Sequence, residues 1–477
     1  MLRILYITNA TTFYILREPL GLAYVAGAAK KAGHINRFCG IDPVRTEQVV
    51  REFSPDVVAY STTSGEHALF LELNRHLKKK AEFFAVFGGP HPTFRPEMVS
   101  EPGVDAVCRG EGEAPFAELL RRIEAGREVD STPSFWVKRY GEVYRNDVLP
   151  LPDDLDEIPW PDRESIFEAF PETRTNPIKC FIANRGCPYK CSYCFNERFW
   201  ALYKGKGKRV RVRSPQSIVD EVNHIRAVST LKMALFNADI FAYSKKWLAE
   251  FAEIFPKQVG LPFYTNVRAE LVDDEYARLL AKAGCKSVGM GIEHGLDRVR
   301  NEVFNRNQSV EEIVRAGKAL HDAGVEMVSY NILGVPGTTL DDDLKTLELN
   351  LKARASYAAT FTLAPFPGTG MYEWLLEHDY VQPISSDVNL DYYGRSMLPI
   401  DQKDERERLY YLFGAAVRSK TVRSILHLLL RAPLLPLYKL LFRMHRGWYY
   451  KKKAFPIRHG ALWTLKSVWR YLSYKHR

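Results

Sequence analysis

The sequence lacks the features of a secreted or membrane-spanning protein. Its 477 residues contain no run of 18 uncharged apolar residues, so we expect no transmembrane helix. No secretory signal is recognised at its start, and only seven cysteines are present, which together predict a reducing, cytoplasmic compartment. With 46% hydrophobic residues the chain can bury sizeable cores, and its length predicts about two to four domains.

Acidic residues are missing from the end of the sequence. From Arg408 onward there are 16 Lys and Arg and no Asp or Glu, whereas the whole chain carries a net charge of +10, which leaves the first 407 residues at −6. This asymmetry predicts an acidic surface as the partner of a mostly helical, basic region at 381–477. Apolar residues in it recur at helical spacing near the end, at Leu462, Leu465, Val468, Trp469 and Leu472.

Apolar stripes bordered by Trp, Tyr and cations are typical of helices that lie in a membrane interface. We therefore expect a peripheral protein on the inner face of the membrane. Nucleic acid is the rival acidic partner, and the many leucines favour lipid over it. A third interpretation is a helical cap that packs on the preceding domain and exposes its basic face.

Three of the cysteines, Cys187, Cys191 and Cys194, stand within eight residues in the run RGCPYKCSYCFN, with Tyr193 directly before the last of them. Three thiolates can hold a 4Fe-4S cluster that keeps one iron open to an outside ligand. Zinc usually takes four Cys or His ligands, and the sequence has no second C-x-x-C or H-x-x-x-H pair to supply them. The other cysteines are expected to be buried small hydrophobes, namely Cys39, Cys108, Cys180 and Cys285.

This run resembles the C-x-x-x-C-x-aromatic-C motif of the radical S-adenosylmethionine (radical SAM) enzymes. The resemblance implies that Cys187, Cys191 and Cys194 ligate the cluster and that its open iron binds the amino and carboxylate groups of SAM. It also implies that one electron from the cluster cleaves SAM to a 5′-deoxyadenosyl radical, and that Tyr193 lies near the adenine.

Residues 176–380 contain six strand-like runs that alternate with helical stretches. This pattern predicts a partial (β/α)6 barrel of the TIM type, with functional residues at the carboxyl ends of the strands. The resemblance implies SAM contacts there from Glu293 in GMGIEHG, from Arg268 in TNVRAE, and from the turn residues Gly334, Pro336 and Gly337.

Two of these assignments have structural alternatives. Glu293 could cap the next helix, and Arg268 could form a structural salt bridge. The run FNADIF departs from the pattern of relatives, which commonly show two adjacent acids, because Ala238 replaces the first and only Asp239 remains.

Residues 1–140 contain five strand-like runs alternating with helices, which predicts a doubly wound, Rossmann-like parallel sheet. Ligands bind outside the carboxyl ends of the strands in such sheets. The pieces PLGL, SPDVVAYS, GGPHPTF and RGEGE resemble the cobalamin-binding domain that precedes many radical SAM domains. The resemblance implies cobalamin contacts from Pro19, Leu20, Gly21, Ser61, Thr62, Thr63, Gly88, Gly89, Pro90, His91, Glu111 and Gly112.

No D-x-H-x-x-G motif is present, so we expect a bound cobalamin to have no His ligand on its lower face. The alternative is a first domain that serves only as a scaffold. Residues 141–175, rich in Pro and Asp, are predicted to form a linker between the domains.

Together these resemblances imply a cobalamin-dependent radical SAM enzyme that methylates an unactivated carbon of a hydrophobic small molecule. A lipid, an isoprenoid or a tetrapyrrole would suit, with electrons from an external donor. Two alternatives remain open: a radical oxidative cyclase or rearrangement enzyme like the anaerobic porphyrin-ester cyclases, and a non-catalytic iron–sulfur sensor on nucleic acid. No residue is assigned as a catalytic acid or base.

Overall fold

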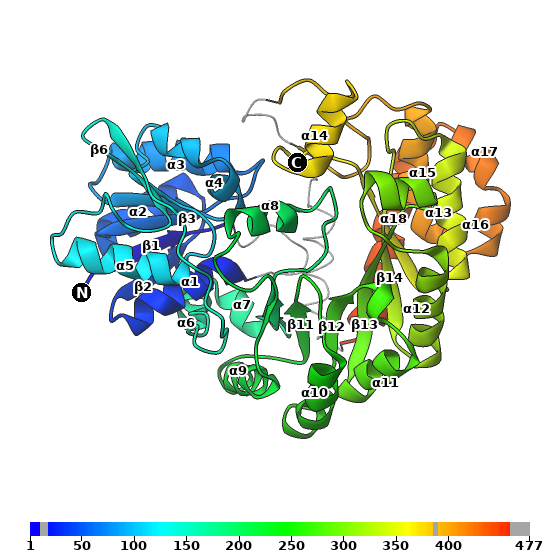
Figure 1. Ribbon diagram of the computed structural model, residues 1–477, viewed down its shortest axis with the longest axis horizontal. Helices are drawn as coiled ribbons and strands as arrows, with labels where there is room; N and C mark the ends of the chain where they lie inside the picture. The colour runs from blue at the N-terminus through cyan, green and yellow to red at the C-terminus, as the bar shows by residue number, and fades with distance from the viewer. Residues whose placement is uncertain (10–17, 385–389, 458–477) are drawn as a thin grey trace.

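The computed structural model describes residues 1–9, 18–384 and 390–457. Two separate sheets, each covered by helices, lie side by side, and the C-terminal helices pack against the second of them (Figure 1). The predicted fold class, a Rossmann-like sheet followed by a partial barrel and a helical C-terminal region, is confirmed.

The first sheet has the strand order β2-β1-β3-β4-β5-β6-β7, in which the first five strands of the chain are parallel and the last two form an antiparallel hairpin. The hairpin extends the sheet past the predicted boundary at 140. Its strands are β1 (Arg3–Ile7), β2 (Ile35–Cys39), β3 (Val57–Ser61), β4 (Phe84–Gly88), β5 (Ala106–Cys108), β6 (Phe135–Arg139) and β7 (Glu142–Arg145). The helices are α1 (Leu20–Lys31), α2 (Pro43–Phe53), α3 (His67–Lys78), α4 (Pro90–Phe94), η1 (Pro96–Ser100) and α5 (Glu113–Glu124).

Both faces of this sheet are buried because alternate residues of each strand enter different cores. On β1, Ile4 and Tyr6 pack into one core, whereas Leu5 and Ile7 pack into the other. A strand that is covered on both faces reads as a continuous apolar run, which is why these strands could be located from the sequence.

The predicted linker at 141–175 contains two short helices, α6 (Arg163–Ala169) and α7 (Pro171–Thr175). Ile166 and Phe170 pack into the core of the first sheet. Asp162 caps α6 by accepting from Ser165 N, and it also accepts a hydrogen bond from Asn36 of β2 at 2.8 Å. The second half of this segment is thus part of the first domain's packing.

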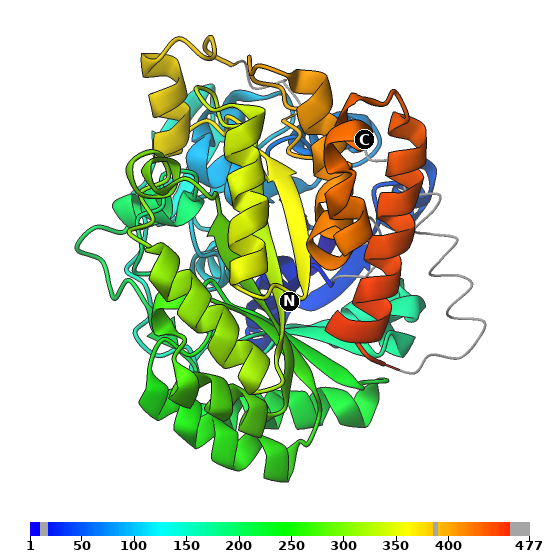
Figure 2. The same cartoon turned by 90° about the vertical axis from the view of Figure 1, so that its right-hand side faces the viewer.

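The second sheet has six strands, all parallel, in the order β15-β14-β13-β12-β11-β8. Its edge strands β8 and β15 are not paired with each other, so the described residues form an open partial barrel with helices outside (Figure 2). Its strands are β8 (Ile178–Ile182), β11 (Met233–Asn237), β12 (Phe263–Val267), β13 (Cys285–Glu293), β14 (Glu326–Leu333) and β15 (Tyr357–Thr362), and a small hairpin pairs β9 (Asn184–Arg185) with β10 (Arg211–Val212). The helices are α8 (Phe195–Leu202), α9 (Pro215–Val228), α10 (Lys245–Gln258), η2 (Ala269–Leu271), α11 (Asp274–Ala283), η3 (Val299–Val303), α12 (Val310–Asp322), α13 (Leu340–Lys352) and α14 (Gly370–Glu377).

The C-terminal region packs on the barrel through α15 (Lys403–Arg418), which contacts β15 and α13. It continues through α16 (Lys420–Ser424), α17 (Leu426–Arg431), α18 (Leu435–Tyr449) and η4 (Tyr450–Ala454). The predicted stripe at Leu462, Leu465, Val468, Trp469 and Leu472 lies outside the described residues.

The end of the described chain packs into the barrel at the amino ends of its strands. Phe455 packs with residues near the starts of several strands, among them Met233, and Ser287 donates to Ala454 O at 2.8 Å. Lys453 pairs at 2.9 Å with Glu326, the first residue of β14. This segment therefore closes the amino ends of the strands and leaves the carboxyl ends for the site. Among the described residues, no helix combines the length and apolarity needed to span a membrane.

Candidate functional site

The three cysteines of the motif lie together on the loop between β9 and α8, at the carboxyl end of the barrel. All three are free thiols; Cys191 is buried, and Cys187 and Cys194 are half-buried. Burial raises the pKa of Cys194 to about 12, and the nearby charges of Cys191 and Cys187 contribute to the rise. Iron binding would thus displace protons from this loop.

The start of the cysteine loop is held by close backbone contacts. Gly186 has φ +85°, and a Cβ there would lie 1.9 Å from Arg209 O. Arg209 donates to the carbonyls of Cys187 at 2.9 Å and of Tyr189 at 3.0 Å. Asp239, the acid that remains in FNADIF, accepts from Gly186 N at 2.9 Å. Neither Arg209 nor Asp239 was assigned this role from the sequence.

The far side of the loop is bonded to two other barrel segments. Ser192 N donates to Phe304 O at 3.0 Å, and Ser192 O accepts from Met371 N at 2.8 Å. Asn305 donates to Lys190 O at 2.9 Å. The loop is thereby held at both ends and in the middle, as a site that positions three thiolates requires.

The three thiols also have to meet the requirements of a metal site. No group of three or more His, Cys, Asp and Glu side chains in the described ranges is close enough to hold one metal ion. In a 4Fe-4S cluster each thiolate binds a different iron, so its sulfurs stand further apart than the ligands of one ion. Three buried or half-buried thiols on one fixed loop therefore fit a cluster.

Arg268 follows β12 and lies against the cysteine loop. Its Nη1 donates to Cys191 Sγ at 3.2 Å, and its guanidinium lies 3.6 Å from the centre of the Tyr189 ring. Arg268 also pairs with Glu270 and donates to Arg306 O at 2.9 Å. The salt bridge considered from the sequence is present, and a contact of Arg268 with SAM stays a prediction.

Glu293 ends β13 in a buried group with Tyr193 and Arg306. Tyr193 Oη donates to Glu293 Oε1 at 2.9 Å, and Arg306 Nη1 lies 2.8 Å from the same oxygen and 2.6 Å from Tyr193 Oη. Burial raises the pKa of the Glu293 carboxyl, while Arg306 opposes the rise. The backbone of Glu293 is strained, with φ at +64°. The SAM contacts predicted for Tyr193 and Glu293 stay predictions.

The capping alternative for Glu293 does not hold, because the next helix, η3, begins after Arg298 without a side-chain cap, and α12 beyond it is capped by Ser309. Arg306 was missed by sequence reasoning. It stands in the polar run FNRNQS with no local signal, and its partner Tyr193 lies 113 residues earlier in the chain.

The predicted turn residues follow β14. Gly334 and Gly337 have φ of +72° and +75°, values that glycine adopts without a steric cost, and Pro336 stands between them. Gly334 N donates to Asp343 at 3.3 Å, which ties the turn to α13.

A cavity of about 240 Å³ lies at the carboxyl edge of the first sheet. A Cβ at Gly89, where φ is +97°, would lie 2.9 Å from Ser61 Oγ, so the turn after β4 can pass this close only as glycine. Five glycines among the lining residues leave room for a ligand close to the backbone at this edge, which fits a bound cobalamin. Seven of the predicted cobalamin contacts line it, namely Gly21, Ser61, Gly88, Gly89, Pro90, Glu111 and Gly112.

Five predicted contacts do not line this cavity: Pro19, Leu20, Thr62, Thr63 and His91. Thr62 is fully buried, and its hydroxyl has no hydrogen-bond partner among the described residues. His91 is buried and stacks on His67 with ring centres 3.8 Å apart. Residues 10–17, which follow β1, lie outside the described part of the chain.

Residues of the barrel reach the edge of the first sheet. Arg185 of β9 lines the same cavity and pairs with Glu111 at 3.0 Å and with Glu113 at 2.5 Å. Glu111 is therefore engaged with the barrel as well as facing the cavity. Phe94 of α4 stacks on Phe195, the residue after Cys194, with ring centres 5.0 Å apart.

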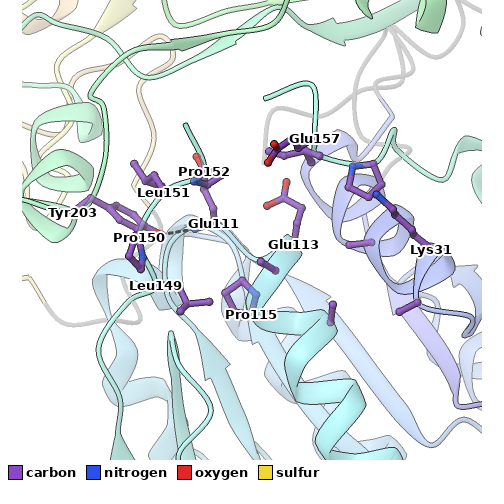
Figure 3. Close-up of a pocket in the computed structure, with 16 residues that line it drawn as sticks. Lys31, Glu111, Glu113, Pro115, Leu149, Pro150, Leu151, Pro152, Glu157 and Tyr203 are labelled. Atoms are coloured by element: carbon purple, nitrogen blue, oxygen red, sulfur yellow. Dashed lines mark hydrogen bonds between the residues drawn. The ribbon is translucent and has the colours of Figure 1, made fainter. Parts of the chain in front are cut away.

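A second cavity, of about 390 Å³, lies between α1, α5 and the segment 149–159 (Figure 3). Glu113 and Glu157 point into it, and Tyr203 accepts a hydrogen bond from Glu111 N at 2.8 Å on its other side (Figure 3). It was not predicted from the sequence, because the segment that closes it was taken for a linker.

The fold and site define a two-domain protein in which a loop of three thiols on a partial barrel faces the ligand edge of a Rossmann-like sheet. Comparison with known families gives the same division. Residues 181–349 match the radical SAM superfamily, and residues 8–120 match the B12 binding domain.

Several related proteins match over most of the chain. An uncharacterised methyltransferase of Pyrococcus horikoshii is 27% identical over 76% of this chain and 79% of its own. The hopanoid C-3 methylase of Methylococcus capsulatus is 24% identical over 97% of this chain and 85% of its own. An anaerobic magnesium-protoporphyrin IX monomethyl ester cyclase of Cereibacter sphaeroides is 26% identical over 75% of this chain and 60% of its own.

Among solved structures, the cobalamin-dependent SAM radical enzyme OxsB superposes with a TM-score of 0.71 at 14% identity over 94% of this chain and 71% of its own. The radical SAM methyltransferase TsrM of Kitasatospora setae superposes with a TM-score of 0.66 at 17% identity, over 80% of this chain and 78% of its own. These likenesses support the fold.

The chain therefore carries a radical SAM domain and a B12-binding domain. It is a cobalamin-dependent radical SAM enzyme whose cofactors are a 4Fe-4S cluster, SAM and cobalamin.

Proposed function

We propose that this enzyme transfers a methyl group to an unactivated carbon of a hydrophobic small molecule. The observation that carries the proposal is the stacking of Phe94 on Phe195. It joins the turn that begins at the predicted cobalamin residues Gly88 and Gly89 to the residue that follows Cys194. A cobalamin bound at the turn and a cluster bound by the cysteine loop would then both be able to reach the same substrate.

When bound, the cluster with SAM supplies a hydrogen-abstracting radical and cobalamin supplies the methyl group. The chain's own residues hold the cysteine loop and orient the side chains of the site. Arg209 and Asp239 fix the cysteine loop, and Arg268 places a positive charge against Cys191 Sγ, which favours an added electron there. Glu293, held by Tyr193 and Arg306, presents a carboxylate group at the carboxyl end of β13.

The proposed substrate is a lipid, an isoprenoid or a tetrapyrrole. Methylation of hopanoids is named for one relative and a tetrapyrrole reaction for another, and these names support a hydrophobic small molecule as the substrate class. We further propose an external electron donor and a cytoplasmic enzyme that associates with the inner face of the membrane. The basic C-terminal region supports the membrane partner.

The test is anaerobic reconstitution with iron, sulfide and hydroxocobalamin, followed by reduction and assay with SAM and candidate substrates. We expect 5′-deoxyadenosine, bound cobalamin and a product heavier by one methylene unit, because a methyl group replaces a hydrogen. The Cys191→Ala variant is the control for reactions that need no cluster.

The product mass separates this proposal from its alternative. A radical cyclase, favoured by the similarity to the porphyrin-ester cyclase, would give loss of hydrogen or an unchanged mass. Deoxyadenosine without any methylated product from the hydrophobic substrates would contradict methyl transfer.

A further inference from the structure

The outer face of α18 is an apolar stripe that no described residue covers. The stripe consists of Leu437, Leu440, Leu441, Met444 and Trp448. These side chains are 46–61% exposed. Their spacing of three and four residues puts them on one side of the helix. Ile425, Leu428 and Leu434, from the preceding helices and turn, are also exposed.

A different face of α18 packs on the rest of the protein. Tyr438 packs into the C-terminal core and Tyr449 into the barrel, and the buried Phe442 contacts the rings of Tyr410 and Tyr411 on α15. A helix that needed only to cap the barrel would carry polar residues on its outer side. The outer apolar stripe therefore has a use that packing within the described chain does not explain.

Large exposed apolar side chains gather in this one region. Of the 18 large hydrophobic residues that are exposed in the described ranges, eight lie between Ile425 and Trp448. Helices α17 and α18 stand on the outside of the C-terminal region, and Figure 2 shows α18 at the edge of the molecule. Clustered exposure of this kind marks an interaction surface, whereas scattered single residues do not.

Cations border the stripe. The Arg418 guanidinium lies 4.9 Å from the centre of the Trp448 ring, and Arg418 and Lys420 are exposed. Arg431 is exposed before the helix, and Lys451 and Lys452 are exposed after it. Glu326 and Glu407, which lie outside the helix, pair with Lys453 and Lys439.

The apolar stripe and the cations that border it together indicate the kind of partner that this surface binds. We infer that α17 and α18 dock on the surface of a bilayer that contains anionic lipids, with the stripe inserted among the headgroups. A second copy of the chain fits less well, because a two-fold interface would bring the same cations face to face, and no acidic residue follows Glu407 to balance them. This inference gives a contact surface to the proposed membrane association and does not depend on methyl transfer.

The test is co-sedimentation of the reconstituted enzyme with vesicles, measured without substrate so that it is independent of turnover. We expect binding to vesicles of phosphatidylcholine with phosphatidylglycerol at least about tenfold tighter than to phosphatidylcholine alone, and weaker in high salt. The double variant Leu441→Gln/Met444→Gln should weaken binding about tenfold or more.

Matched controls keep the result specific. The double variant Val44→Gln/Leu69→Gln removes apolar side chains from α2 and α3 that are more exposed than Leu441, and it should bind as the wild type does. Lys451→Gln/Lys452→Gln should weaken binding to the anionic vesicles, whereas Lys246→Gln/Lys352→Gln, on α10 and α13, should not. Iron content and melting temperature establish that each variant is folded.

Three outcomes would overturn the inference. One is the absence of binding to anionic vesicles by the folded wild type. Another is a dimer in solution that the Leu441→Gln/Met444→Gln change dissociates, which would make the stripe an interface between copies. The third is vesicle binding that survives the changes in α18 and is lost when residues 458–477 are deleted.

Discussion

The Arg268 guanidinium donates a hydrogen bond to the sulfur of Cys191, with Nη1 3.2 Å from Sγ. The side chain of Arg268 is buried, and its other nitrogens are taken by Glu270 and by Arg306 O, so its direction is fixed. A cation held against one cluster ligand stabilises the more negative, reduced form of the cluster.

Replacing Arg268 with Gln should therefore lower the reduction potential of the cluster and slow the formation of 5′-deoxyadenosine. A redox titration followed by electron paramagnetic resonance measures the potential, and Arg268→Lys should lie between the variant and the wild type. The matched control is Arg298→Gln, which changes an exposed arginine. An unchanged potential in Arg268→Gln, with the cluster intact, would contradict the role.

Substitution of Cys191 by Ala should abolish cluster binding, because two thiolates cannot hold a cubane whose third protein ligand is missing. We expect iron per chain to fall to about a tenth or less of the wild-type amount. Cys285→Ala is the control, since Cys285 is buried on β13 away from the loop, and it should keep its iron with a loss of stability of about 1 kcal/mol. Equal iron in the two variants would reject the assignment.

Alanine at Gly89 should weaken cobalamin binding by about tenfold or more, because its Cβ would press on Ser61 and Thr62 and its φ of +97° disfavours any side chain. The corrin absorbance of the reconstituted protein reports the stoichiometry. Gly126→Ala is the matched control: it too has positive φ, at +63°, but no atom lies within 4 Å of the added Cβ. If both variants bind cobalamin as the wild type does, the cavity is not its site.

Acid should destabilise the first domain through His91. Burial, with the charges of His67 and Arg95, lowers the pKa of His91 to about 4. The unfolded chain takes up a proton near the ordinary pKa of about 6.5, and the folded chain does so only near 4. The free energy of unfolding therefore decreases as the pH falls from about 6.5 toward 4, and by pH 5 the loss reaches about 2 kcal/mol.

Melting temperatures at pH 7.5 and pH 5 check this expectation. His91→Gln can keep a hydrogen bond to Ser64 and cannot be protonated, so it should lose less stability between the two values than the wild type. His427→Gln, which changes an exposed histidine on α17, should behave as the wild type does. A wild-type slope in His91→Gln would show that another group controls the acid response.

The sequence by itself determined the parts of this protein that depend on local pattern. Apolar β-branched runs located the parallel strands, because a strand buried on both faces must be apolar throughout. The spacing of Cys187, Cys191 and Cys194 predicts the cluster loop, since three thiolates on one short loop need no other part of the chain. The turn at Gly334 and Gly337 was expected from its resemblance to the family's motif, and both glycines have the positive φ that only glycine adopts without a steric cost.

Only the tertiary structure decided which side chains meet across long distances. Arg306 joins Tyr193 and Glu293, and Arg268 reaches Cys191, over separations of 13 to 113 residues that no local pattern encodes. The same holds for the outer face of α18. Its leucines have the spacing of a core, and only the packing of Tyr438 and Phe442 on the protein shows which side of the helix is left facing outward.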